Sequence, residues 1–189
     1  LNTTGAENVA VGTLTLDACT SGTRNVAVGR SALSSLTTGH DNCAFGQDAG
    51  FSITTTHNNI AIGKTAGYGI TTGAYNITIG AAAGDAITTG PYNVAIGRNA
   101  LGTATTADSN TAIGDSALAN ATTGSQVAVG MNALGNCTTG YSNCAVGLAS
   151  LESLTTGYQN SAVGINSGQY LTTGNYNSIL GRYAGRGIT

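Results

Sequence analysis

Charged residues are scarce in this sequence of 189 residues. Lys, Arg, Asp and Glu make up only 7% of the chain, whereas ordinary soluble domains contain about 25%. Six basic residues are too few to neutralise a nucleic-acid backbone, so the composition predicts no nucleic acid partner. The net charge of −2 also indicates no strongly charged partner of any other kind.

Proline, tryptophan and long apolar runs are also nearly or wholly missing. The chain has one proline and no tryptophan, which excludes a Pro-rich linker or a collagen-like repeat. No run approaches the roughly 18 apolar residues of a membrane span, so we predict no membrane insertion of this segment. The sequence begins in the middle of a repeat, without an initiator Met or a signal-peptide pattern. We therefore expect it to be a fragment of a longer fibre.

What the sequence does contain is one motif, Asn-x-Ala-Val/Ile-Gly, repeated along its whole length. We call the first residue of each copy the ladder position, and positions +1, +2 and so on are counted from it. Successive ladder positions are 17 residues apart, with one step of 16, and they are Asn8, Asn25, Asn42, Asn59, Asn76, Asn93, Asn110, Gln126, Asn143, Asn160 and Asn177. The spacing predicts a single repeat domain over residues 1–189, with one short unit near 123–126.

Each unit contains two short apolar segments separated by turn residues. Position +3 is always large and apolar, +4 is always Gly, and a second apolar column at +11 precedes Thr-Thr-Gly. Such segments are too short for independent helices, and one unit cannot bury its apolar side unless units stack. We predict an all-β fold: a parallel β-solenoid, or β-roll, of about eleven coils of 17 residues. At ~4.8 Å per coil the rod is about 50 Å long.

Stacking brings equivalent side chains into columns. The ladder residues should then bond their side-chain amides from coil to coil. The 16-residue unit should loosen the structure locally at Thr123–Gln126 without breaking it, because the apolar columns resume in phase.

Position +8 is Leu in some units and Gly in others, and an aromatic residue follows some of these glycines. This predicts that the rings of Phe51, Tyr68 and Tyr170 fill the space that leucine would occupy.

The repeat resembles those of phage and giant-virus tail-fibre proteins, and its Asn-x-Ala-Ile-Gly core is similar to the head repeat of trimeric autotransporter adhesins. The resemblance covers about residues 3–189. It implies a left-handed coil, association of three chains side by side as a homotrimer, and an extracellular location on a virion fibre or a bacterial surface. The period of 17 is longer than that of the adhesin heads, so the cross-section of the coil must differ.

The four cysteines lie in columns that we assign to the core. Cys43 and Cys144 occupy position +1, and Cys19 and Cys137 occupy the apolar +11 column. Free cysteine packs as a small hydrophobe, so buried thiols are favoured over disulfides. No zinc-ligand spacing is present, and we expect neither a bound metal nor a cofactor.

His40 and His57 share one column in adjacent coils. The pair could bind a metal ion, but two exposed turn residues are the favoured interpretation. Scattered carboxylates and serines without a partner His form no catalytic set. The hexapeptide-repeat acyltransferases, which are also solenoids, have a period that does not divide 17. We therefore expect no enzyme and no catalytic residue, and a left-handed β-helix acyltransferase stays as the least favoured alternative.

Five of the eight tyrosines are predicted to lie along one edge of the rod, at the turn before the ladder position. They are Tyr75, Tyr92, Tyr141, Tyr158 and Tyr176. A row of rings with polar tips suits ring stacking within the rod, a seam between subunits, or contact with a glycan. Stacking or subunit packing is favoured over ligand binding.

The Thr-Thr column raises a second function, because ice-binding solenoids present regular rows of threonine. Adjacent strand residues point to opposite sides, so only one Thr per coil can face outward here, and ice binding is the weaker hypothesis. The favoured hypothesis is a structural and adhesive fibre segment. It would be a rigid rod that spaces or presents a tip binding a cell-surface glycan or protein receptor.

Overall fold

The computed structural model describes residues 4–188. These residues form a parallel β-solenoid with eleven strands and no helix. Each strand has three residues, at positions +1 to +3 of one unit. The strands are β1 (Val9–Val11), β2 (Val26–Val28), β3 (Cys43–Phe45), β4 (Ile60–Ile62), β5 (Ile77–Ile79), β6 (Val94–Ile96), β7 (Thr111–Ile113), β8 (Val127–Val129), β9 (Cys144–Val146), β10 (Ser161–Val163) and β11 (Ser178–Leu180). The prediction of an all-β parallel solenoid is confirmed.

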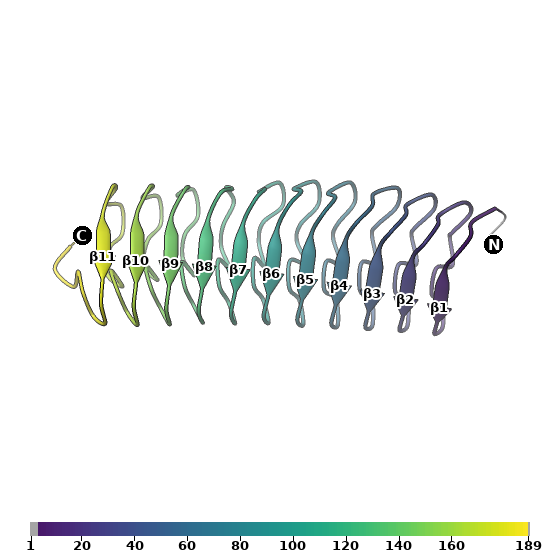
Figure 1. Ribbon diagram of the computed structural model, residues 1–189, viewed down its shortest axis with the longest axis horizontal. Helices are drawn as coiled ribbons and strands as arrows, with labels where there is room; N and C mark the ends of the chain where they lie inside the picture. Colours follow the sequence, from purple (N-terminus) through teal and green to yellow (C-terminus); the bar gives the residue numbers. More distant parts are fainter. Residues whose placement is uncertain (1–3, 189) are drawn as a thin grey trace.

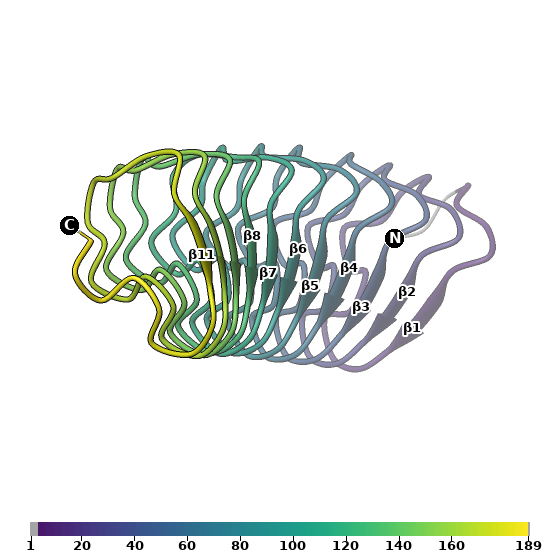
Figure 2. The same cartoon turned by 60° about the vertical axis from the view of Figure 1, so that its left-hand side comes forward.

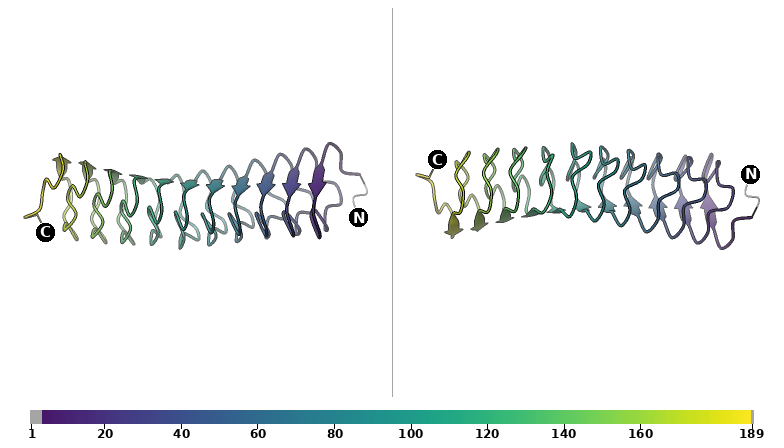
Figure 3. Two further views of the ribbon diagram at one scale, coloured as in Figure 1. Left: turned by 90° about the horizontal axis from the view of Figure 1, so that it is seen from below. Right: turned by 90° about the horizontal axis from the view of Figure 1, so that it is seen from above.

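The strands form one sheet in the order of the sequence, β1 to β11, and they lie side by side along the rod with the two chain ends at its opposite tips (Figure 1). Each strand residue pairs with the residue one unit later, as in Ala27 with Ala44. Each coil is a flattened loop with its strand on one side (Figure 2). The strand side turns gradually from one tip to the other (Figure 3), as expected for twisted strands.

The second apolar segment of each unit forms turns and no strand. Its backbone enters the left-handed region at positions +6 and +8, as at Ser31 and Leu33, with φ values of 57° and 48°. The position before the ladder residue is also left-handed, as at Tyr75 with φ 60°. These turns bend the chain back towards the next strand. They are stabilised by bonds between coils, such as Leu33 N to the Ala49 oxygen at 3.1 Å.

The interior is narrow and is filled from four columns. Except in the two end coils, alanines at +2 and +7, leucines at +8 and the apolar column at +11 are almost completely buried. Position +8 lies across the interior from +2, because a Cβ added to Gly67 would be 3.6 Å from the Cβ of Ala61. Little room is left for a side chain larger than alanine at +2 wherever +8 is leucine.

The choice of Gly over Leu at +8 follows this space in several coils. Thr78 and Ile179 replace the usual alanine at +2. A Cβ on Gly84 would lie 2.7 Å from Thr78 Cγ2, and one on Gly168 would lie 2.8 Å from Ile179 Cδ1. The larger +2 residue therefore takes the volume that leucine takes elsewhere.

The prediction that aromatic rings fill this space is wrong. Phe51 and Tyr68 stack on each other at 5.0 Å between centroids. Tyr68 and Tyr170 are 40% and 50% exposed. The rings therefore lie outside the core. Core side chains fill the space next to the glycines.

The ladder residues directly precede the strands, are buried from Asn25 to Asn160, and bond from coil to coil. Asn93 Nδ2 donates to Asn76 Oδ1 at 3.1 Å and to the Ala107 carbonyl at 2.9 Å. Asn93 Oδ1 in turn accepts from the backbone N–H and from Nδ2 of Asn110, both at 3.1 Å. Each asparagine therefore satisfies buried backbone groups of its own coil and of the next.

The 16-residue coil keeps the register and loses part of the ladder. Thr111 of β7 pairs with Val127 of β8, so the sheet continues across the short unit. Gln126 takes the ladder position, yet its buried Nε2 has no partner among the described residues. The Gly140 carbonyl, which a ladder amide would contact in a full unit, accepts instead from the Thr123 hydroxyl. The shortened turn thus leaves one buried donor unpaired.

Restoring this unit to full length should stabilise the protein. We expect insertion of one residue after Gly124 together with Gln126→Asn to raise the free energy of unfolding by roughly 1–3 kcal/mol, because a buried amide gains its acceptor. Urea unfolding measures the change. Gln126→Asn alone should destabilise the protein, since the shorter side chain cannot span the shortened turn. A repaired chain no more stable than the parent would contradict this account of the short coil.

Candidate functional site

The outer side of the sheet is an apolar surface that runs the length of the rod. We call it the strand face and define it as positions +1 and +3 of β1 to β11. In each strand from β2 to β11 the middle residue is buried and its two neighbours are partly or largely exposed. Large side chains on this face are well exposed, among them Val11 at 57%, Phe45 at 43% and Val163 at 42%. Monomeric proteins rarely leave a continuous apolar patch of this kind in water.

The prediction that Cys43 and Cys144 lie in the core is therefore wrong. Both belong to the strand face and are only half-buried, whereas Cys19 and Cys137 in the +11 column are buried as expected. The cause is the strand alternation, which turns +1 and +3 outward when the small +2 residue faces the narrow interior. All four cysteines are free thiols. Burial raises the pKa of the Cys43 and Cys137 thiols, which keeps them protonated at neutral pH.

The five tyrosines form two groups along the edge before the strands. Tyr75 and Tyr92 stack at 5.2 Å between centroids. Farther along the rod, Tyr141 and Tyr158 stack at 5.0 Å, and Tyr176 meets Tyr158 edge-on at 5.3 Å. The coils between the two groups carry serine at the position just before the ladder residue. Ring stacking within the rod accounts for these contacts, and the exposed faces remain open to a ligand.

The two histidines extend the first aromatic group. The rings of His40 and His57 are stacked at 4.8 Å with an angle of 5° between their planes, and His57 meets Tyr75 edge-on. Parallel stacked rings do not aim two nitrogen lone pairs at a common point. Within residues 4–188 no group of three or more His, Cys, Asp or Glu side chains could hold a metal ion.

Charges of opposite sign stack in neighbouring coils. Arg24 Nε lies 2.7 Å from Asp41 Oδ1, and Arg98 Nη2 lies 2.8 Å from Asp115 Oδ2. Hydrogen bonds from Arg24 and His40 hold the pKa of the Asp41 carboxyl well below its usual range. Like charges would repel at this spacing, and where charged residues occupy one column in adjacent coils here, as in these two pairs, their signs are opposite.

The first threonine of most Thr-Thr pairs donates its hydroxyl to the next coil. The Thr88 hydroxyl donates to the Thr105 carbonyl at 2.9 Å, and Thr155 bonds Thr172 in the same way at 3.1 Å. The second threonine is exposed, as at Thr38 and Thr106. In some coils the first threonine is exposed as well, as at Thr105 and Thr138.

Comparison with known proteins found no matching family model, no similar curated protein and no similar solved structure. Among residues 4–188 no helix is long and apolar enough to cross a membrane.

Proposed function

We propose that this chain is a structural segment of a fibre, a rigid rod that spaces or presents a binding tip outside the cell. In this proposal the chain has a mechanical role and catalyses no reaction. The rod repeats the same backbone bonds around every coil, as in Val94 N to the Asn110 oxygen at 2.8 Å and Leu101 N to the Ala117 oxygen at 3.0 Å. A backbone bonded in this way throughout resists local opening, bending and proteolysis.

The strand face is the observation that carries the proposal. It exposes valine, isoleucine and phenylalanine on successive coils without interruption by a charged residue. Exposed apolar surface of this extent favours association, and a repeat of ~4.8 Å in each copy would let neighbouring chains match coil by coil. We propose that three left-handed coils pack through their strand faces as a homotrimer.

The test is to place charge on this face. Ile62→Glu combined with Ile113→Glu should convert the trimer to monomers at micromolar concentration, because each glutamate would be buried unpaired in the interface. Light scattering measures the mass, and far-ultraviolet circular dichroism checks the fold.

Thr72→Glu combined with Thr106→Glu is the matched control, since it adds the same charge to exposed sites on another side of the rod. This control should remain a trimer. A monomeric parent protein, or a trimer that survives both glutamates on the strand face, would contradict the proposed assembly.

A further inference from the structure

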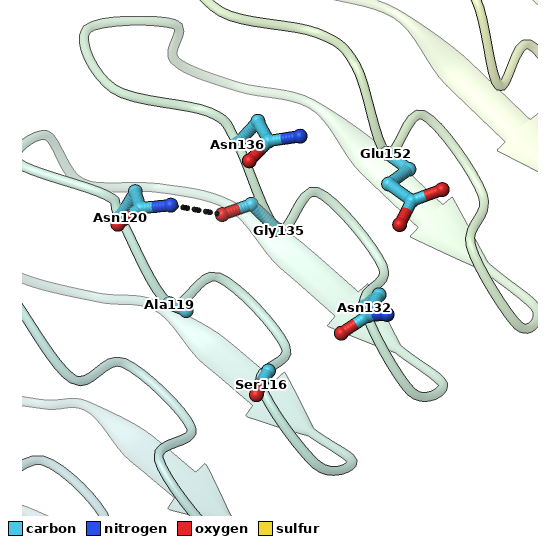
Figure 4. Close-up of a pocket in the computed structure, with 7 residues that line it drawn as sticks. All are labelled: Ser116, Ala119, Asn120, Asn132, Gly135, Asn136 and Glu152. Carbon is cyan, nitrogen blue, oxygen red and sulfur yellow. Dashed lines mark hydrogen bonds between the residues drawn. The ribbon is translucent and has the colours of Figure 1, made fainter.

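A polar hollow lies in the turns that follow the strands, away from the strand face. Its volume is about 170 Å³. The floor consists of Ala119 and Gly135 at position +9 of two successive coils, and Glu152 closes one end in the same column. Asparagines from the two coils line its sides (Figure 4).

The backbone conformation at position +9 does not require the small residues of the floor. Gly135 does not have the left-handed conformation that many of the other glycines adopt, and a Cβ added to it would lie 3.2 Å from the Asn132 carbonyl oxygen. The same column holds Tyr68 and Glu152 in other coils. A large side chain is therefore compatible with this position, and its absence leaves the hollow open.

The hollow contains polar groups without partners. The side-chain amides of Asn132 and Asn136 make no hydrogen bonds with the described residues, whereas the Asn120 amide is occupied by the Gly135 carbonyl at 2.8 Å. One carboxylate oxygen of Glu152 accepts from Gln169 Nε2 at 2.9 Å, which leaves its second oxygen free. In Figure 4 Glu152 faces the gap between Asn132 and Asn136. Donors and acceptors from two coils thus converge on one space.

This set of groups selects a neutral, hydroxyl-rich ligand. Amides and carboxylates pair with hydroxyl groups, which both donate and accept. No Lys or Arg is among the residues that line the hollow, so no positive charge would offset the repulsion between Glu152 and an anionic ligand. A metal ion would require more charged ligands than this one carboxylate.

The surroundings suit a chain of sugars. Position +10 is polar in three successive coils, at Asn120, Asn136 and Ser153, and Tyr170 follows in the next coil with half of its surface exposed. The polar groups recur at the coil spacing of ~4.8 Å, and an exposed ring is a stacking surface for the apolar face of a sugar. We propose that the hollow binds a neutral oligosaccharide, a property that does not depend on trimer formation.

The experiment is saturation-transfer NMR on the full chain with cellotetraose and maltotetraose as neutral probes and tetragalacturonate as the acidic probe. We expect saturable binding of at least one neutral probe and none of the acidic one. Gly135→Tyr should weaken binding at least tenfold by filling the hollow. Ser34→Tyr, in the same column far from the hollow, should bind as the parent does.

Asn132→Ala combined with Asn136→Ala should weaken binding to a similar degree while leaving the volume open, which keeps the test valid if Gly135→Tyr does not fold. Three results would each overturn the proposal: no transfer to either neutral probe at millimolar concentration, equal transfer in the asparagine variant and the parent, or binding of tetragalacturonate as strong as that of the neutral probes.

Discussion

Gly80→Ala is expected to lower the free energy of unfolding by roughly 2–6 kcal/mol, because strained backbone and overpacking each cost about 1–3 kcal/mol. Gly80 occupies position +4 with φ at 130°, and an added Cβ would lie 2.7 Å from both the carbonyl carbon and the oxygen of Gly97 in the next coil. The obstacle is backbone, which cannot rotate away as a side chain can. The same close approach of one coil to the next explains the +4 glycines from Gly12 to Gly164.

Gly102→Ala is the matched control, since it adds the same methyl group at a glycine outside the left-handed region, 3.2 Å from the nearest oxygen. Its effect should be within about 1 kcal/mol of zero. Urea unfolding followed by circular dichroism gives both values. If the two variants are equally stable, the coils do not approach each other at position +4 as described.

Asn93→Ala should destabilise the protein by roughly 2–6 kcal/mol. The substitution removes the donor to the Ala107 carbonyl and the acceptor of the Asn110 backbone N–H. Each of these buried groups then costs about 1–3 kcal/mol when left unpaired. Denaturant unfolding measures the loss, and hydrogen exchange should show faster exchange at the Asn110 amide.

Asn136→Ala is the control for this prediction, because Asn136 is exposed and lies outside the ladder column. It should leave the free energy of unfolding within about 0.5 kcal/mol of the parent value. An equal loss in both variants would show that the ladder contributes nothing beyond ordinary asparagine packing.

The period of the sequence was sufficient to predict the architecture. A repeat of 17 residues with invariant Gly at +4 predicts stacked coils, and the structure pairs each strand with the next in that register. The short unit at Thr123–Gln126 could be predicted to keep the columns in phase, because the apolar positions on both sides retain their order. These features depend only on spacing.

The direction of the strand side chains could not be predicted from spacing. Valine and isoleucine at +1 and +3 are larger than alanine at +2, and hydrophobicity alone assigns the larger residues to the core. The turns decide otherwise, since they bring position +8 within contact distance of +2 and leave room there only for a small residue wherever +8 is leucine. The exposed strand face and the misplaced Cys43 and Cys144 both follow from this one geometric fact.

The polar hollow was also missed. Its floor residues, Ala119 and Gly135, carry no chemistry by themselves, and its asparagines are common residues in this sequence. The available signal was position +9, which carries a large side chain at Tyr68 and Glu152 but a small residue at Ala119 and Gly135. That signal acquires meaning only when the coils are stacked and the neighbouring columns are known.

The central claim, that successive units stack in register, is tested most directly by distances between spin labels on exposed threonines of one column. After replacement of the four native cysteines, labels at Thr38 and Thr106 lie four coils apart, and labels at Thr38 and Thr156 lie seven coils apart. At ~4.8 Å per coil the backbone separations should be about 19 Å and about 34 Å. Labelled chains are diluted with unlabelled ones, so that only distances within a chain contribute. The predicted result is two narrow distance distributions whose means differ in proportion to the number of coils between the labels. Distances that do not grow with the number of coils would contradict the stacked solenoid.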